Sequence, residues 1–369
     1  MLEKGRISVS DFRVLVIIFS IGSSVILAPS LLAGFAKQDG WISFLLAILI
    51  SLSFIFLYNR LASYFPEMTF VQYSQVILGK PIGKFVSVLF LLYLFQICIS
   101  LLREIGEFIT TNVLVETPIQ IIMTMFILTS LVGVRLGLEV IGRTATIFMP
   151  WITGLLAMLL LLLIPEYSLM NLQPFFEGGM KPILKGTYHS LAIPFLELSF
   201  FLMIFPFVKN HEKARSAFYQ GTIIGGIAVF LMVFCTILSL GPETTLRQAY
   251  APYLLGKKVS VLDFFQRFEI LVAIIWFLTI YFKLTVSYYA LSLGLAQLFN
   301  LNSYKILLFP LALLIIGSAI HLFPNIVMFQ RLMLVTSVPI SLLISLFLPL
   351  LLLVVGRLRK ARLHEIRNS

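Results

Sequence analysis

The 369-residue sequence has little charge and almost no cysteine. Asp, Glu, Lys and Arg together make up 12% of the chain, and its two cysteines, Cys98 and Cys235, both fall within apolar runs. Cysteines in such positions are expected to pack, so no disulfide framework is implied. No Lys/Arg-rich segment is interleaved with aromatic residues, which argues against a nucleic-acid-binding protein.

The sequence also lacks the residue clusters that are typical of enzymes. His189 and His321 are isolated, and neither a nucleotide-binding loop nor a Ser-His-Asp or Cys-His set is readable. Most connections between apolar runs are short, which leaves little chain for a catalytic domain outside a membrane. We therefore expect neither enzymatic activity nor a bound cofactor or metal.

Long apolar runs dominate what is present. Hydrophobic residues make up 60% of the chain, and the mean hydropathy is +1.03. Runs of this length without alternation predict an all-α polytopic membrane protein rather than a β-barrel. Residues 1–369 are expected to form a single transmembrane domain with ten spanning helices. The expected ranges are 11–35, 41–64, 82–111, 118–134, 144–164, 183–207, 214–240, 261–292, 303–321 and 333–356.

Two of the ten predicted helices contain residues that interrupt a helix. The first carries Gly22, Ser23, Ser24 and Pro29, and the sixth carries Pro194. Backbone groups freed inside a bilayer must face protein or a water-filled cavity. Interrupted helices at matching positions of two halves indicate a transporter-type binding site.

The two halves of the chain follow the same plan. Residues 11–164 and 183–356 each contain five predicted helices, of which the first is interrupted and the third is the longest. Because five is an odd number, the second copy is inverted in the membrane. This pattern predicts a LeuT-type 5+5 inverted repeat with broken helices 1 and 6. Ten helices in another order are the alternative.

The net charge of +11 is interpreted as a topology signal. Most of the 27 Lys and Arg residues fall on one side of the predicted helices, among them those of a short basic tail at 357–369. Since cytoplasmic loops are enriched in Lys and Arg, both termini are expected to be cytoplasmic.

Several stretches together resemble the spore germination permease family. This family comprises the B subunits of Ger-type nutrient germinant receptors, within the amino acid–polyamine–organocation superfamily. The matching stretches are 22–29, 36–43, 78–83, 137–143 and 267–271, with Trp276 beyond the last. The combination carries the resemblance, which covers essentially the whole chain.

The resemblance implies a function and a set of partners. It implies a transporter-like receptor subunit in the endospore inner membrane that recognises a small germinant: an amino acid, a nucleoside or a sugar. A larger membrane A subunit, a C lipoprotein subunit and membrane lipid are the implied partners. A free-standing proton-coupled amino-acid transporter using the same pocket is the alternative.

The predicted ligand site lies where the first helix is interrupted. Backbone N–H groups at the start of the second half-helix favour an anionic or polarised ligand group. Alternatively, the serines only cap the half-helix. The expected ligand-binding residues are Gly22, Ser23, Ser24, Val25, Tyr93, Gln96, Pro194, Phe195, Leu196 and Glu197.

Two further sets of charged residues fall within the predicted helices. Glu197 has only apolar neighbours, and Lys283 is expected at a similar depth, so the two are candidate partners. They form either a proton- or cation-sensitive switch or a static ion pair. An outer charge cluster is expected to act as an interfacial salt-bridge lattice or as an extracellular gate. Its members are Arg103, Glu104, Glu107, Arg267 and Glu269.

Overall fold

The computed structural model describes residues 3, 5–258, 268–323 and 326–358, and this part of the chain is helical. Eight stretches of the described chain are long and apolar enough to cross a membrane. They are Ser24–Tyr64, Lys80–Asn112, Ile119–Leu136, Leu138–Leu162, His211–Leu240, Glu269–Leu298, Tyr304–Leu322 and Leu334–Leu358. The first of these contains two α-helices joined by the short 3₁₀ helix Lys37–Asp39.

The long helices lie close to the ranges that the hydrophobic runs predict. They are α3 (Gly40–Tyr64), α5 (Lys80–Asn112), α6 (Ile119–Leu136), α7 (Leu138–Leu162), α9 (His211–Leu240), α12 (Glu269–Leu298) and α13 (Leu308–Leu322). Three expected ends are wrong, one of which is the start of the last predicted helix: it lies at Ile326 and not at 333. The helix predicted from 144 begins at Leu138, because Gly137 (φ 95°) ends α6 and α7 starts directly after it. The helix predicted to end at 292 continues to Leu298, and its expected first residues, 261–267, lie outside the described residues.

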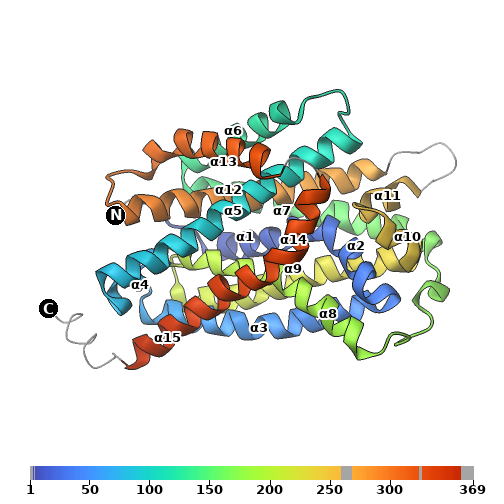
Figure 1. Ribbon diagram of the computed structural model, residues 1–369, viewed down its shortest axis with the longest axis horizontal. Helices are drawn as coiled ribbons and strands as arrows, with labels where there is room; N and C mark the ends of the chain where they lie inside the picture. The colour runs from blue at the N-terminus through green and yellow to red at the C-terminus, as the bar shows by residue number, and fades with distance from the viewer. Residues whose placement is uncertain (1–2, 4, 259–267, 324–325, 359–369) are drawn as a thin grey trace.

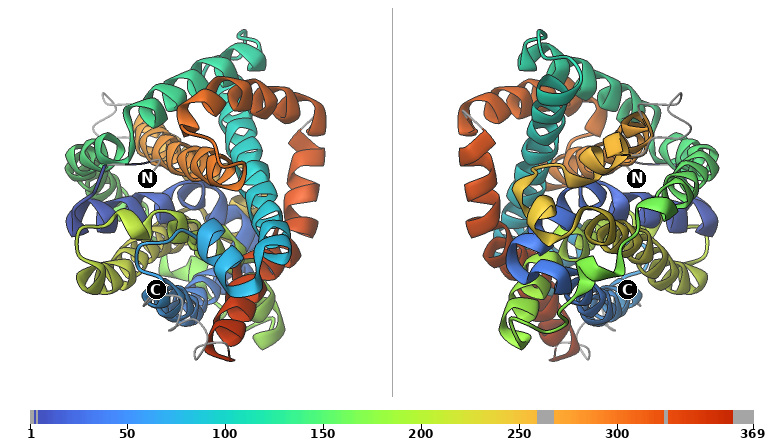
Figure 2. Two further views of the ribbon diagram at one scale, coloured as in Figure 1. Left: turned by 90° about the vertical axis from the view of Figure 1, so that its left-hand side faces the viewer. Right: turned by 90° about the vertical axis from the view of Figure 1, so that its right-hand side faces the viewer.

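The first interrupted segment lies at the centre of the bundle (Figure 1). It consists of α1 (Val9–Ile21) and α2 (Ser24–Ala36), which are separated by a turn at Gly22 and Ser23. Every residue of α1 from Val14 to Ile21 is buried, and α1 packs against α7, α9 and α12. Figure 2 looks along the bundle and shows α6 and α13 at one edge and α3 and α15 at the opposite edge.

The second interrupted segment follows α8 (Met180–Ser190). A wide π-helical turn over Leu191–Phe195 contains Ile193 in an extended conformation (φ −125°, ψ 115°), because Pro194 has no N–H to continue a regular helix. Two short 3₁₀ helices, Leu196–Met203 and Phe205–Phe207, follow it. All eight residues of the first are buried.

The last segment and three short helices are the remaining α-helices of the described chain. α14 (Ile326–Ser341) passes through a π-helical turn at Leu342–Phe347 into α15 (Leu348–Leu358), which crosses the front of the bundle in Figure 1. The hydrophobic runs do not predict the short helices, which are α4 (Phe70–Leu78), α10 (Pro242–Arg247) and α11 (Ala251–Lys258).

The N-terminal segment binds several helix ends together. Ile7 pairs with the backbone around Val208: its N–H donates to Phe207 O (3.0 Å), and its carbonyl accepts from Lys209 N (3.1 Å). The buried carboxylate of Glu3 accepts from the hydroxyls of Tyr289 (3.2 Å) and Tyr304 (3.1 Å).

The start of α1 is held in the same region. Ser8 and Asp11 cap it reciprocally, and Asp11 also accepts from the Thr146 hydroxyl of α7 (2.8 Å). The first turn of α1 is thus fixed to a neighbouring helix.

Candidate functional site

A central cavity of about 410 Å³ lies beside the turn between α1 and α2. Its walls come from α2, α5, the end of α8, the π-helical turn after α8, and α14. The last two residues of α10 and the connection 248–250 to α11 line one end, and Leu246 to Ala249 are exposed there. The cavity therefore extends from the α10–α11 connection to the interrupted helices.

Five of the ten predicted ligand-binding residues line this cavity: Ser23, Ser24, Tyr93, Gln96 and Glu197. The structure thus brings together residues of the first, third and sixth predicted segments. The other five are not among the lining residues in the described part of the chain, and they are buried beside them. These are Gly22, Val25, Pro194, Phe195 and Leu196.

Apart from Glu197 Oε2, which is ion-paired with Lys283, four buried oxygen atoms in the cavity wall have no hydrogen-bond partner among the described residues. They are Oγ of Ser24, Ser100 and Ser190, and Oε1 of Glu104. None of these four residues is more than 7% exposed. Buried polar groups are nearly always paired, because leaving one unpaired costs roughly 1–3 kcal/mol. Four such groups facing one hollow are the arrangement expected of a site for a polar ligand.

Glu104 belongs to this cavity and not to the outer charge cluster in which the sequence placed it. Its carboxyl group interacts with Ser23, Trp276 and Lys283. Successive residues of an α-helix point about 100° apart. Glu104 therefore faces the cavity while Arg103, its neighbour in sequence, forms a buried ion pair with Glu107 on another face of α5.

The rest of the predicted outer cluster is not assembled in the described part of the chain. Glu269 is the first residue of α12 and is half-buried, and it forms no ion pair with any described residue. Arg267 lies outside the described residues. Among the described members of the cluster, Arg103 and Glu107 are the two that form an ion pair.

Glu197 and Lys283 form the predicted buried pair. Lys283 Nζ lies 2.6 Å from Glu197 Oε2, and the two side chains are 0% and 3% exposed. The ammonium also lies 5.2 Å from the ring centroid of Phe19 on α1. Lys283 thus reaches from α12 to both interrupted segments.

Gly22 makes room for this lysine rather than for a ligand. A Cβ added at residue 22 would lie 2.5 Å from Lys283 Cδ and 2.9 Å from the backbone oxygen of Phe19. The absence of a side chain therefore allows the lysine stem to pass over the turn between α1 and α2.

Tyr93 connects two walls of the cavity. Its hydroxyl bonds the Ser341 hydroxyl at the end of α14 (2.6 Å), and its ring packs edge-on against Phe200 (5.5 Å between centroids). Tyr93 is thus a satisfied part of the wall. Gln96, one turn away on α5, is half-buried beside it.

Ser100 and Glu104 line the cavity although neither was predicted as a ligand-binding residue. A sequence signal for both is nevertheless present on α5. Gln96, Ser100 and Glu104 are spaced four residues apart within an apolar helix, so they share one face. All three line the cavity. Ser190 carries no comparable signal, since it stands alone at the end of α8.

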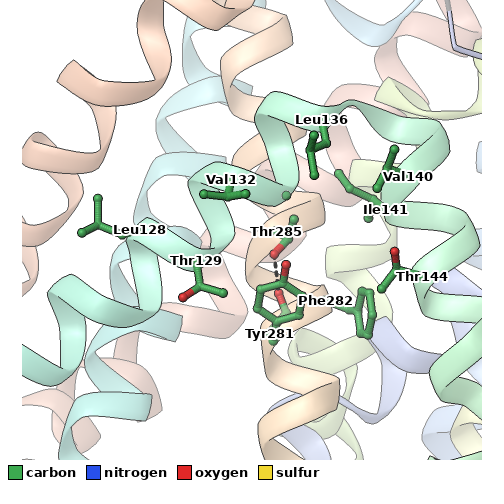
Figure 3. A pocket seen from close by; sticks show the side chains of 11 residues that line it. Leu128, Thr129, Val132, Leu136, Val140, Ile141, Thr144, Tyr281, Phe282 and Thr285 are labelled. Atoms are coloured by element: carbon green, nitrogen blue, oxygen red, sulfur yellow. Dashed lines mark hydrogen bonds between the residues drawn. The ribbon is translucent and has the colours of Figure 1, made fainter.

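A second hollow, of about 500 Å³, lies between α6, α7 and α12 (Figure 3). It is largely apolar, and Val132 and Leu136 in its wall are 55% and 60% exposed. The hydroxyls of Thr129 and Thr285 donate to carbonyls of their own helices. None of its lining residues has a buried polar atom without a partner in the described structure, so its chemistry favours apolar contact only.

The described residues contain no group of three or more His, Cys, Asp or Glu side chains that could hold a metal ion.

Two solved structures share this fold. The chain superposes on Mhp1, a nucleobase-cation-symport-1 family transporter with bromovinylhydantoin bound, with a TM-score of 0.67 and 12% identity over 92% of this chain and 78% of that one. It superposes on MhsT in complex with L-phenylalanine with a TM-score of 0.65 and 15% identity, over 96% and 90% of the two chains. The chain thus has the same fold as these two proteins, and its apolar helices are those of a multi-pass membrane protein.

The chain belongs to the spore germination protein family, whose profile matches residues 6–327. It is 28% identical to spore germination protein KB of Bacillus subtilis (strain 168), over 88% of this chain and 87% of that protein. It is 25% identical to spore germination protein YndE of the same organism, over 96% and 97% of the two chains. Identity to spore germination protein GerLB of Bacillus cereus is also 25%, over 74% and 73%. The family to which the sequence motifs pointed is thereby confirmed.

Proposed function

We propose that this chain is the transporter-like B subunit of a spore nutrient germinant receptor, and that a small germinant binds in the central cavity. The observation that carries this proposal is the set of four unpartnered oxygens around one hollow beside the turn between α1 and α2. Binding there would contact both interrupted segments at once. A ligand could therefore change how the two segments sit against each other and so trigger germination.

The same proposal includes ten spanning segments in two inverted sets of five. The eight long stretches include α2 and α3 as one, and they leave out the interrupted segment from α8 to Phe207. Counting α1 with α2, α3 alone, and that interrupted segment gives ten. The two interrupted segments then stand first in each set, in agreement with the 5+5 arrangement.

The proposed orientation places both termini in the cytoplasm of the spore. It is supported by the contacts of Ile7 with Lys209 and of Glu3 with Tyr304, because the charge pattern assigns all four to the cytoplasmic side. The α10–α11 end of the cavity then faces outward, where a nutrient arrives. Assembly with an A subunit and a C lipoprotein in the endospore inner membrane completes the proposal, in line with the germination proteins that this chain resembles.

Adding bulk to the central cavity tests the proposal. In spores with this chain as the only B subunit, Ser100→Leu should abolish the germination response to a panel of single nutrients, because the new side chain occupies the cavity. The rate would be followed by the fall in optical density, and the abundance of the chain by immunoblot. Val132→Phe, which adds bulk to the second hollow, is the matched control and should respond normally. A normal response of Ser100→Leu would contradict the site.

The transporter neighbours favour one second candidate, a free-standing amino-acid transporter. The purified chain in proteoliposomes should not accumulate labelled L-amino acids, with or without an inward proton gradient, if it is a receptor subunit. Accumulation that depends on the proton gradient would favour transport.

A further inference from the structure

We infer that Tyr58 of α3 is a positioning residue of the proposed receptor. Its buried hydroxyl holds the last membrane segment, α14–α15, against the second interrupted segment, and a nutrient in the central cavity releases this hold. The inference rests on the proposed function, because the nutrient binds in the same cavity. It adds to that function the contact through which occupancy of the cavity reaches α15.

The hydroxyl of Tyr58 lies between two irregular stretches of backbone. Tyr58 is fully buried, and its Oη donates to the Ser345 carbonyl oxygen, in the π-helical turn Leu342–Phe347, at 2.8 Å. The same Oη lies 3.4 Å from the carbonyl oxygen of Leu196, at the start of the 3₁₀ helix Leu196–Met203. A tyrosine hydroxyl has one hydrogen, so it makes a strong bond to one of these oxygens at a time. In this structure the stronger bond is to Ser345.

The Ser345 carbonyl group needs a donor from outside its own helix. In a regular α-helix it would accept from the N–H of residue 349, but that residue is Pro349, which has none. Buried backbone carbonyl groups are nearly always hydrogen-bonded. The Tyr58 hydroxyl supplies a donor, and it thereby fixes the place at which α14 passes into α15.

Further contacts hold the same segments together. Ser199 Oγ, one 3₁₀ turn beyond Leu196, donates to Ser345 Oγ at 2.9 Å. Below the π-helical turn, α15 lies beside α3 (Figure 1), and Arg357 near its end donates to the hydroxyl of Tyr64 at 3.4 Å. The start and the end of α15 are therefore both held on α3.

The two segments that meet at Tyr58 also line the central cavity. Glu197 directly follows Leu196, and Ser341 lies four residues, about one helical turn, before Ser345. A nutrient in contact with Glu197 or Ser341 would therefore shift one of the two carbonyl groups relative to the other. A shift of Leu196 toward Tyr58 would draw the hydroxyl hydrogen away from Ser345 and release the π-helical turn.

Tyr58→Phe separates this role from a merely structural one. The change removes the hydroxyl and keeps the ring, which stacks on Phe218 of α9 with 6.4 Å between centroids. Since the shorter bond favours the held position of α15, its loss should make release easier. Spores carrying the variant should respond at a half-maximal nutrient concentration about tenfold lower than the wild type. A loss of stability alone would lower abundance and response, and would not make the spores more sensitive.

The germination test uses spores with this chain as the only B subunit. The twenty L-amino acids, D-glucose and inosine are applied one at a time, and the fall in optical density gives the half-maximal concentration of each that acts. Tyr73→Phe is the matched control, because Tyr73 of α4 is also buried and its hydroxyl has no hydrogen-bond partner among the described residues. The control should respond like the wild type, and immunoblots should show equal amounts of both variants.

Hydrogen–deuterium exchange of the purified chain in detergent gives a second measurement, which needs no nutrient. In Tyr58→Phe, the backbone amides of residues 342–353 should exchange about tenfold faster than in the wild type, because the π-helical turn has lost its hold. The amides of α7 should exchange at the wild-type rate. Tyr73→Phe should match the wild type in both regions.

Two results would overturn the inference and leave the proposed function in place, provided that Ser100→Leu fails to respond. One is an unchanged or raised half-maximal concentration in Tyr58→Phe, and the other is exchange at residues 342–353 equal to that of the wild type. If none of the nutrients acts, the exchange measurement decides. If Ser100→Leu responds normally, the cavity is not the germinant site and the proposed function itself is wrong.

Discussion

At the scale of single residues, the site depends on how the few charged side chains buried inside the helical bundle are paired. Glu197 and Lys283 are both almost completely buried and lie within ion-pair distance. A buried pair adds little to stability compared with apolar residues of the same volume, but removing one partner strands the other charge in a low dielectric. A substitution of either residue alone is therefore expected to destabilise the chain.

A double-mutant cycle measures this loss of stability. Glu197→Gln and Lys283→Met should each destabilise the chain by roughly 3–5 kcal/mol, and the double variant should recover much of that loss. The measurement is thermal unfolding of the purified chain, with abundance in spore membranes as the second readout. If the pair is also a switch, the double variant should be abundant and still fail to respond to germinant.

The exposed pair Glu139–Arg143 of α7 provides the control for this cycle. Its side chains are 40% and 68% exposed, so the coupling energy between them should be well below about 1 kcal/mol. Strictly additive effects at Glu197 and Lys283 would mean that the two groups do not interact.

At the scale of helices, the hydrophobic runs predict most of the long elements, because a membrane requires long apolar stretches. The interruption between α1 and α2 was also predictable, since Gly22 and the two serines stand out in an apolar run. Short helices such as α10 and α11 were missed because six to eight residues outside the long runs carry no length signal. The place of Glu104 was missed because sequence proximity grouped it with Arg103 and Glu107, whereas helical rotation separates them.

A substitution in the turn between α1 and α2 tests the packing there. Gly22→Val should abolish the germination response and destabilise the chain by about 1–3 kcal/mol, because its Cβ would overlap the Lys283 stem and the Phe19 carbonyl oxygen. Gly34→Val in α2 is the control, since an added Cβ there meets nothing within 4 Å. Unchanged germination in the Gly22 variant would show that Lys283 can leave this position without effect.

At the scale of the whole molecule, the fold is that of a transporter while the relatives by sequence are germination proteins. The sequence predicted this combination because motif resemblance and the pattern of interrupted helices are independent signals. It could not predict the ligand, because the cavity wall combines residues from segments that are far apart in the chain. Only their three-dimensional arrangement shows which polar atoms remain without partners.

Chemical labelling tests the proposed orientation. Both cysteines are buried and free, so a Cys98/Cys235-free background can carry single cysteines. Cysteines at the exposed positions Lys181 and Glu243 should react with a membrane-impermeant maleimide in intact cells expressing the chain. Cysteines at Lys209 and Lys305, also exposed, should react only after permeabilisation. The reverse pattern would place the α10–α11 end of the cavity in the cytoplasm.

The backbone pairing of Ile7 with Phe207 and Lys209 has a mechanical consequence. It joins the residues just before the first interrupted segment to those that end the second, through two main-chain hydrogen bonds. Neither segment can therefore slide far at this end without breaking those bonds or moving the other with it. The two interrupted segments are therefore expected to move together at this end, while the unpartnered oxygens of α2, α5 and α8 line the cavity beside the turn between α1 and α2.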